Sequence, residues 1–117
     1  MTKREDMPYI EDILRAIDDI QESIKRSSKD KFSSNKDKKD ANIRRLEIIG
    51  EASRNLSNKL KERYKEIEWS KIIGTRNRVI HNYSDVDIDI LWKIIKNDIP
   101  ELKKQVEKIK KELKLKG

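Results

Sequence analysis

Apolar residues recur at intervals of three and four along most of the chain, and this spacing constrains the fold more than any other sequence feature. Residues three and four apart lie on one face of an α-helix, so each series predicts a helix with one buried face. The first series is Ile10, Ile13, Leu14, Ile17, Ile20 and Ile24, and the second is Ile43, Leu46, Ile49, Leu56 and Leu60. The last is Leu91, Ile94, Ile95, Leu102, Val106, Ile109 and Leu113. We therefore expect an all-α fold, an antiparallel bundle of four or five helices.

Breaks in the apolar pattern predict where these helices are connected. Residues 27–40 are rich in Ser, Asn, Asp and Lys, so we expect a flexible basic loop there. A third helix should begin at Trp69 or Ser70 and continue through Ile80. The run Ser84-Asp85-Val86-Asp87 then interrupts the pattern and offers a cap for the next helix.

Gly50 and Pro100 fall inside apolar series, where both residue types disfavour a regular helix. Glycine costs a helix about 1 kcal/mol relative to alanine, so we expect a neighbouring helix to cross closely at Gly50. Proline lacks the N–H that a helix interior needs, so we expect a kink or a new start near Ile99. A basic C-terminal helix over about 101–116 should follow.

Length and composition exclude several classes of protein and of site. With 117 residues the chain should form a single domain, residues 1–117. The absence of cysteine excludes disulfides, thiol catalysis and thiolate metal sites, and a lone histidine excludes a multi-histidine zinc site within one chain. No run approaches the length of a membrane span, so we expect a cytoplasmic protein outside the membrane. We also expect no cofactor.

The net charge of +7 is concentrated in two segments. The segments Lys25–Lys39 and Lys103–Gly117 each contain seven basic and two acidic residues. Such segments could attract a phosphate backbone, or they could only keep the protein soluble. The candidate RNA-binding residues are Arg78, Lys103, Lys104, Lys110 and Lys111.

The segment from Arg76 to Tyr83 contains the side chains best suited to chemistry on a phosphate. It holds His81, the lone histidine, five residues after Arg76 and two before Tyr83. On a continuous helix Asn77 would share a face with His81 and could orient its imidazole. Arg76 would lie beside apolar residues and would have to reach solvent, find a carboxylate or meet a partner. The candidate acids are Glu47 and Glu51 on the preceding helix.

The sequence Arg76-Asn77-Arg78-Val79-Ile80-His81-Asn82-Tyr83 strongly resembles the Arg-Asn-x-x-x-His-x-Tyr signature of the HepT-like branch of HEPN domains. The resemblance extends to further blocks in the same order along the chain. These blocks are Arg45 to Ala52, Trp69 to Gly74, Leu91 to Ile95 and Asp98 to Leu102. The basic stretch from Lys25 to Lys39 departs most from the family pattern.

This resemblance implies a homodimeric helical bundle that acts as a metal-independent endoribonuclease. In that branch the enzyme is a toxin, neutralised by a nucleotidyltransferase antitoxin called MNT or MntA. Carried over to this chain, Arg76 and His81 would be catalytic and Asn77 would support them. Tyr83 would be the tyrosine on which the antitoxin places AMP. RNA, with transfer RNA as the family-level guess, would be the substrate.

The chemistry of metal-free RNA cleavage needs a base for the ribose 2′-hydroxyl, an acid for the leaving oxygen and a cation for the phosphorane. Unless water or Tyr83 helps, one histidine cannot readily be both base and acid in one turnover, so the lone His81 favours a composite site across a dimer. Two alternatives remain open. One is a non-catalytic, nucleotide- or RNA-binding partner of a nucleotidyltransferase, and the other is a basic bundle that binds nucleic acid nonspecifically.

Overall fold

The computed structural model describes residues 3–82 and 85–116, and it confirms the all-α prediction. The long helices are α1 (Lys3–Ile24), α3 (Lys36–Asn55) and α8 (Ile99–Lys116). The short helices are α2 (Lys29–Ser33), α4 (Asn58–Arg63), α5 (Trp69–Ile73), α6 (Thr75–Val79) and α7 (Ile88–Lys93). A π-helical turn, η1 (Ile94–Asp98), joins α7 to α8. Strand β1 (Ile80–Asn82) pairs antiparallel with β2 (Asp85–Val86), with Ile80 opposite Val86.

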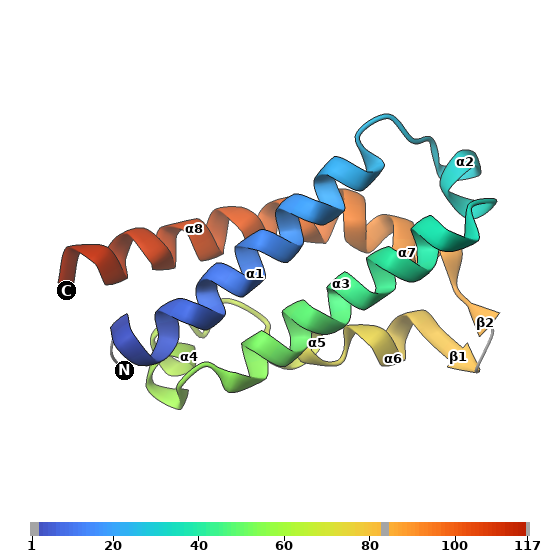
Figure 1. The fold of residues 1–117 in the computed structure, drawn as a ribbon. Helices are drawn as coiled ribbons and strands as arrows, with labels where there is room; N and C mark the ends of the chain where they lie inside the picture. Colours follow the sequence, from blue (N-terminus) through green and yellow to red (C-terminus); the bar gives the residue numbers. More distant parts are fainter. Residues whose placement is uncertain (1–2, 83–84, 117) are drawn as a thin grey trace.

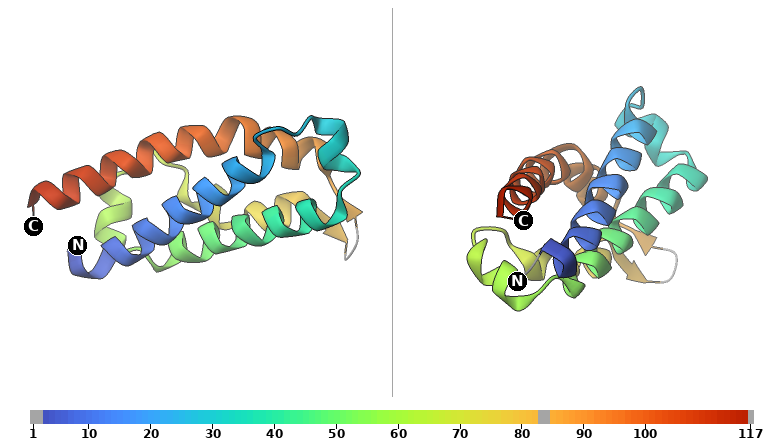
Figure 2. Two further views of the ribbon diagram at one scale, coloured as in Figure 1. Left: turned by 45° about the horizontal axis from the view of Figure 1, so that its top comes forward. Right: turned by 60° about the vertical axis from the view of Figure 1, so that its left-hand side comes forward.

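The helices form an elongated bundle in which α3 is the central element (Figure 1). Helix α1 packs against α3 and α8, and α3 also packs against α5 and α6. Both described ends of the chain lie at one end of the bundle, whereas α2 and the β1–β2 hairpin lie at the other (Figures 1 and 2). The hairpin, which carries His81, is therefore far from the C-terminal end of α8.

The predicted apolar series form the core. Ile10, Ile13, Ile17 and Ile20 of α1 are fully buried, as are Val106 and Ile109 of α8. From α3 and the segment after it, Leu46, Ile49, Leu56 and Leu60 are buried in the same cluster. The hydrophobic periodicity therefore identified the buried face of each long helix correctly.

The prediction of a loop over residues 27–40 was wrong for most of the segment. Ser28 caps α2, where its Oγ accepts a hydrogen bond from the N–H of Lys31 at 3.2 Å. Asn35 caps α3 in the same way, through the N–H of Lys38 at 3.0 Å. Phe32 is fully buried, and its ring lies 5.3 Å from that of Trp92 between centroids. The buried Phe32 ring and the Ser28 cap thus support α2, and the Asn35 cap begins α3, within the segment predicted to be a loop.

The predicted third helix is interrupted at Gly74 and ends before His81. Thr75 Oγ1 donates to the carbonyl oxygens of Lys71 and Ile72, at 3.1 and 2.8 Å. A polar side chain thereby competes for carbonyls at the break between α5 and α6. Ile80 continues the apolar periodicity of α6, but it forms the first residue of β1 instead.

The prediction of a new start near Ile99 is confirmed, since α8 begins at that residue. Pro100 occupies the second position of α8, where the missing N–H interrupts the regular hydrogen-bond ladder. The five residues of η1 absorb this irregularity without separating α7 from α8.

The close crossing predicted at Gly50 is also confirmed. A Cβ atom on Gly50 would lie 3.2 Å from the carbonyl oxygen of Ile73 and 3.3 Å from that of Ile72. Both atoms belong to the backbone of α5, which cannot rotate away as a flexible side chain could. The absence of a side chain at residue 50 therefore lets α5 rest directly on α3.

We expect Gly50→Ala to destabilise the protein, although alanine is the better helix former. The methyl group would push α5 away from α3, and this overpacking should exceed the gain of about 1 kcal/mol in helix propensity. Urea denaturation should show a net loss of about 1 kcal/mol in the free energy of unfolding. Glu51→Ala, at the exposed next residue, is the control and should change it by less than about 0.5 kcal/mol. A Gly50→Ala variant as stable as the parent would contradict the close packing.

Candidate functional site

The candidate site lies where α6 passes into the β1–β2 hairpin. Arg76 is in the first turn of α6 and His81 is the middle residue of β1. Each side chain meets a carboxylate from a different part of the fold, Glu47 of α3 for Arg76 and Asp87 for His81. The site therefore depends on tertiary packing rather than on a single helix.

Arg76 pairs with Glu47, with 3.4 Å between Nε and Oε2. The Arg76 side chain is 53% exposed and that of Glu47 33% exposed, so the guanidinium remains accessible to a ligand. Glu47 lies one turn before Gly50 on α3, and the close approach of α5 at Gly50 brings the start of α6 within its reach. Of the two acids predicted for Arg76, Glu51 instead pairs with Arg54 at 3.0 Å.

His81 lies against Asp87, with 3.4 Å between Nε2 and Oδ2. Two hydrogen bonds fix Asp87, one through its backbone and one through its side chain. Its backbone N–H donates to the carbonyl of Val79 at 2.8 Å, and its Oδ1 accepts from the N–H of Ile90 at 3.1 Å. The sequence indicated that the run ending at Asp87 would supply a helix cap, which it does for α7. It did not indicate the pairing with His81.

Asn77 is exposed on α6, and the prediction that it shares a helix face with His81 was wrong. That prediction required a helix continuing through residue 81, but α6 ends at Val79. In the described structure the imidazole has Asp87 as its hydrogen-bonding partner instead.

Arg76 and His81 are not joined to each other by any hydrogen bond or ion pair within residues 3–82 and 85–116. One chain thus presents two separately supported groups, a guanidinium and an imidazole, at the same end of the bundle. Tyr83, the predicted modification site, lies outside the described residues.

The electrostatics of Asp87 follow from its two partners. The N–H of Ile90 lowers the pKa of the Asp87 carboxyl most. Burial opposes this as the next largest effect, and the hydrogen bond and charge of His81 lower the pKa further. Because this pKa is lowered on folding, ionised Asp87 stabilises the fold above the unfolded-state pKa. That stabilisation is lost as pH falls through the folded-state pKa.

The candidate RNA-binding lysines of α8 lie on an open surface, and one of them, Lys103, is paired with side chains of α1. Lys103 Nζ lies 3.1 Å from Asp18 Oδ1 and 3.2 Å from Gln21 Oε1, so α1 already holds this ammonium group. Lys104 and Lys111 are exposed. Lys103, Lys110, Lys111 and Lys114 line a shallow hollow between α1 and α8, together with the carboxylates of Asp18 and Glu107. Lys114 was not among the residues predicted to bind RNA.

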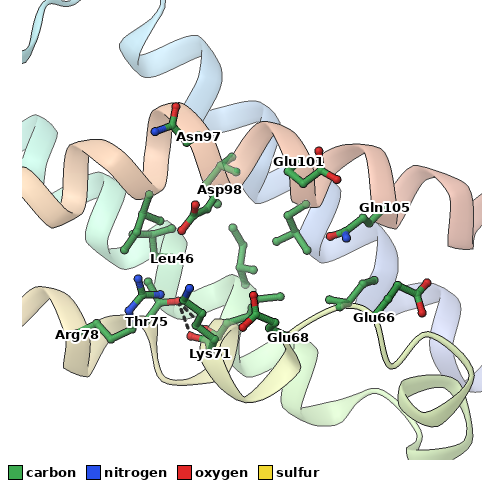
Figure 3. Close-up of a pocket in the computed structure, with 16 residues that line it drawn as sticks. Leu46, Glu66, Glu68, Lys71, Thr75, Arg78, Asn97, Asp98, Glu101 and Gln105 are labelled. Atoms are coloured by element: carbon green, nitrogen blue, oxygen red, sulfur yellow. Dashed lines mark hydrogen bonds between the residues drawn. The ribbon is translucent and has the colours of Figure 1, made fainter.

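Arg78 lines a separate groove of about 350 Å³. Figure 3 shows this groove between α5–α6 and η1–α8, with Leu46 of α3 at its floor. Four carboxylates line it, from Glu66, Glu68, Asp98 and Glu101, against two cations, from Lys71 and Arg78. This excess of negative charge makes the groove a poor site for a phosphate backbone.

Neither a metal-binding cluster nor a membrane-spanning helix is found among the described residues. No group of three or more His, Asp or Glu side chains in that part of the chain could hold a metal ion. Among its helices, none combines the length and the apolar character needed to cross a bilayer.

Comparison with known proteins gives consistent matches over nearly the whole chain. A family model described as Ribonuclease HepT-like matches residues 13–109. A candidate RNase of Methanocaldococcus jannaschii is 42% identical over 107 residues, covering 92% of this chain and 98% of that protein. A probable ribonuclease HepT of Thermococcus cleftensis is 43% identical over 109 residues, covering 93% and 99%. No solved structure gives a significant match.

The pairing of His81 with Asp87 predicts a change in the titration of Asp87. In His81→Ala the pKa of the Asp87 carboxyl should rise, because the imidazole no longer favours the ionised form. It should nevertheless stay below the usual range, because the N–H of Ile90 still donates to Oδ1. Carbon-detected NMR of the side-chain carboxyls measures this directly, with Asp40 as an internal reference on α3. An unchanged Asp87 titration would show that the imidazole does not contact it.

Proposed function

This chain belongs to the HepT-like ribonuclease family, and we propose that it is a metal-independent endoribonuclease that acts as the toxin of a toxin–antitoxin pair. The observation that carries this proposal is the placement of Arg76 and His81. Both lie at one end of the bundle, each is about half exposed, and each is supported by a carboxylate from another part of the fold. They are the groups needed to move a proton and to stabilise a phosphorane.

The proposed reaction starts from the ribose 2′-hydroxyl. A basic nitrogen of His81 takes the hydroxyl proton while the 2′-oxygen attacks the adjacent phosphorus. The bond from phosphorus to the 5′-oxygen breaks, and that oxygen receives a proton from an acid. The products are a 2′,3′-cyclic phosphate and a 5′-hydroxyl end. Arg76 would hold the non-bridging oxygens through its paired N–H donors as charge develops on them.

The acid in this scheme is best supplied by a second subunit. A single chain contains one histidine, and one imidazole that has just accepted a proton must also donate one within the same turnover. A two-fold dimer that brings two copies of this end together would place two His81 and two Arg76 side chains around one phosphate. We therefore propose a homodimer with a composite site, in which Asn77, exposed on α6, contacts the substrate or the partner subunit.

The lysines of α8 are proposed to extend the contact with RNA away from the reacting phosphate. Lys104, Lys110 and Lys111 lie on α8, away from the hairpin, and could bind further phosphates of a folded RNA such as transfer RNA. Lys103 would contribute less, since Asp18 and Gln21 already hold it. Arg78 would contribute least, because acidic side chains surround its groove.

Tyr83 is the proposed site at which a nucleotidyltransferase antitoxin silences the enzyme. The phenol oxygen would attack the α-phosphorus of ATP, forming a phosphodiester to AMP and releasing pyrophosphate. The resulting anion would stand two residues from His81 and would repel an incoming RNA phosphate.

We expect the purified protein to cleave total RNA in excess EDTA and to leave DNA intact, because DNA has no 2′-hydroxyl. His81→Ala and Arg76→Ala should each lower the cleavage rate by about 100-fold or more. Mass spectrometry of the products should find cyclic phosphate ends. Intact mass must first show that the wild-type protein carries no AMP. If unmodified, dimeric wild-type protein binds RNA but does not cut it, the non-catalytic binding partner becomes the better account.

The role of the α8 lysines is tested by the salt dependence of RNA binding. Lys110→Gln combined with Lys111→Gln should weaken binding and lower the slope of log affinity against log salt by roughly one for each phosphate that is no longer neutralised. Cleavage of bound RNA should continue at the wild-type rate. The matched control is Lys59→Gln with Lys65→Gln, at exposed positions on or beside α4. Equal effects of the two pairs would favour nonspecific attraction by net charge.

The antitoxin proposal predicts a defined covalent change. Incubation with an MNT-type nucleotidyltransferase and ATP should add the mass of AMP to the wild-type protein and abolish cleavage. Tyr83→Phe should retain cleavage and gain no mass. Modification of Tyr83→Phe to the same extent would place the acceptor on another residue.

A further inference from the structure

We propose that Asp87 is a positioning residue for His81, which fixes the proton of the neutral imidazole on Nε2 and leaves Nδ1 as the basic nitrogen. The catalytic consequence rests on the proposed function, whereas the position of the proton does not. The contact that motivates the proposal is the 3.4 Å approach of Asp87 Oδ2 to His81 Nε2. An ionised carboxylate can only accept a hydrogen bond, so it favours the tautomer that places N–H on the facing nitrogen.

The geometry of Asp87 leaves this carboxylate little freedom. Its backbone is fixed by the hydrogen bond from its N–H to the carbonyl of Val79, which closes the base of the hairpin. Its Oδ1 is fixed by the N–H of Ile90, as the cap of α7. With one oxygen occupied, Oδ2 is the oxygen that meets the imidazole. The same residue thus joins the start of α7 to the strand that carries His81.

Other charged groups near the hairpin have partners or positions of their own. On α6, Arg76 pairs with Glu47, and Arg78 lines the acidic groove. On α7, Asp89 forms an ion pair with Lys29 of α2. Asp85 is exposed on β2. Within the described residues, Asp87 is the one charged side chain found in contact with the imidazole.

The tautomer matters because the two ring nitrogens would have different tasks. Nε2 keeps its hydrogen and donates it to Asp87, so Nδ1 carries the lone pair that accepts the proton of the 2′-hydroxyl. After this transfer the imidazolium has N–H groups on both nitrogens, and Asp87 stabilises its charge. Returning the proton from Nδ1 to solvent or product restores the starting tautomer.

Asp87→Asn tests this assignment without removing the helix cap, since asparagine caps helices about as well as aspartate. The side-chain oxygen of asparagine would take the place of Oδ1 and accept from Ile90. Its NH₂ group would then face Nε2 and donate to it, which favours the tautomer with hydrogen on Nδ1. Nitrogen-15 NMR can follow the change without assignment ambiguity, because the chain contains one histidine. We expect Nε2–H to dominate in the neutral wild type and the Nδ1–H share to rise in Asp87→Asn.

Two further variants separate positioning from general effects. Asp89→Asn removes the same charge from the first turn of α7 but lies outside the contact with His81, so the tautomer should not change. Asp87→Ser retains a capping oxygen that is too short to serve both Ile90 and the imidazole, so it should lower the Nε2–H share without imposing Nδ1–H. Circular dichroism should show the wild-type helix content in all three. Wild-type nitrogen shifts in both Asp87 variants would overturn the proposal.

Kinetics provide the readout for the proposed reaction. Asp87→Asn should lower kcat for RNA cleavage roughly 10- to 100-fold with little change in KM. This is less than the about 10⁴-fold effect of replacing the buried aspartate of a serine-protease triad, because the His81–Asp87 pair is partly exposed. Asp89→Asn should leave kcat unchanged. If no variant or wild type cleaves RNA while the tautomer still changes in Asp87→Asn, the positioning role stands and the ribonuclease proposal fails. A changed tautomer with an undiminished kcat would overturn the use of Nδ1 as the base.

Discussion

The direct contact of the α5 backbone with Gly50 of α3 is the constraint on which the position of Arg76 in the candidate site depends. Helices usually meet through their side chains, but here two carbonyl oxygens of α5 approach the position that a Cβ would occupy. This close approach sets the depth at which α5 lies and hence the point from which α6 starts. Arg76, in the first turn of α6, can then reach Glu47, one turn before Gly50 on the same helix. A glycine that weakens α3 locally is thus the residue that places the guanidinium.

The imidazole of His81 is positioned by the β1–β2 hairpin, independently of the contact at Gly50. Ending α6 at Val79 turns the chain into β1, and pairing with β2 brings residue 87 back to residue 79. Asp87 can therefore cap α7 and contact His81 at once. Arg76 and His81 are thus supported by different carboxylates, Glu47 and Asp87. In the proposed mechanism the described residues of one chain offer His81 as the base and Arg76 as the cation, and the copy of His81 in a second subunit would supply the acid.

The sequence predicted those parts of the fold that depend on burial and on backbone chemistry. Apolar periodicity reports which side of a long helix is buried, so α1, α3 and α8 were predicted with the right buried faces. Gly50 predicted a close crossing because it lacks a side chain, and Pro100 predicted a helix restart because it lacks an N–H. Prediction from the sequence failed where tertiary contacts determine the local structure. Burial of Phe32 and the Ser28 cap support a helix in a basic segment, and Ile80 fits the helical period but starts a strand. The pairing of Asp87 with His81 depends on hairpin register, which no spacing rule along a helix reveals.

The most direct test of this account is RNA cleavage by a purified heterodimer of one wild-type and one His81→Ala subunit, isolated with two different affinity tags. If base and acid are the two copies of His81 around one phosphate, the heterodimer should be nearly as inactive as the His81→Ala homodimer. Wild-type homodimer isolated through the same two tags is the reference for full activity. A heterodimer with half of that activity would mean that each subunit cleaves RNA with its own histidine alone, and the composite site would be wrong.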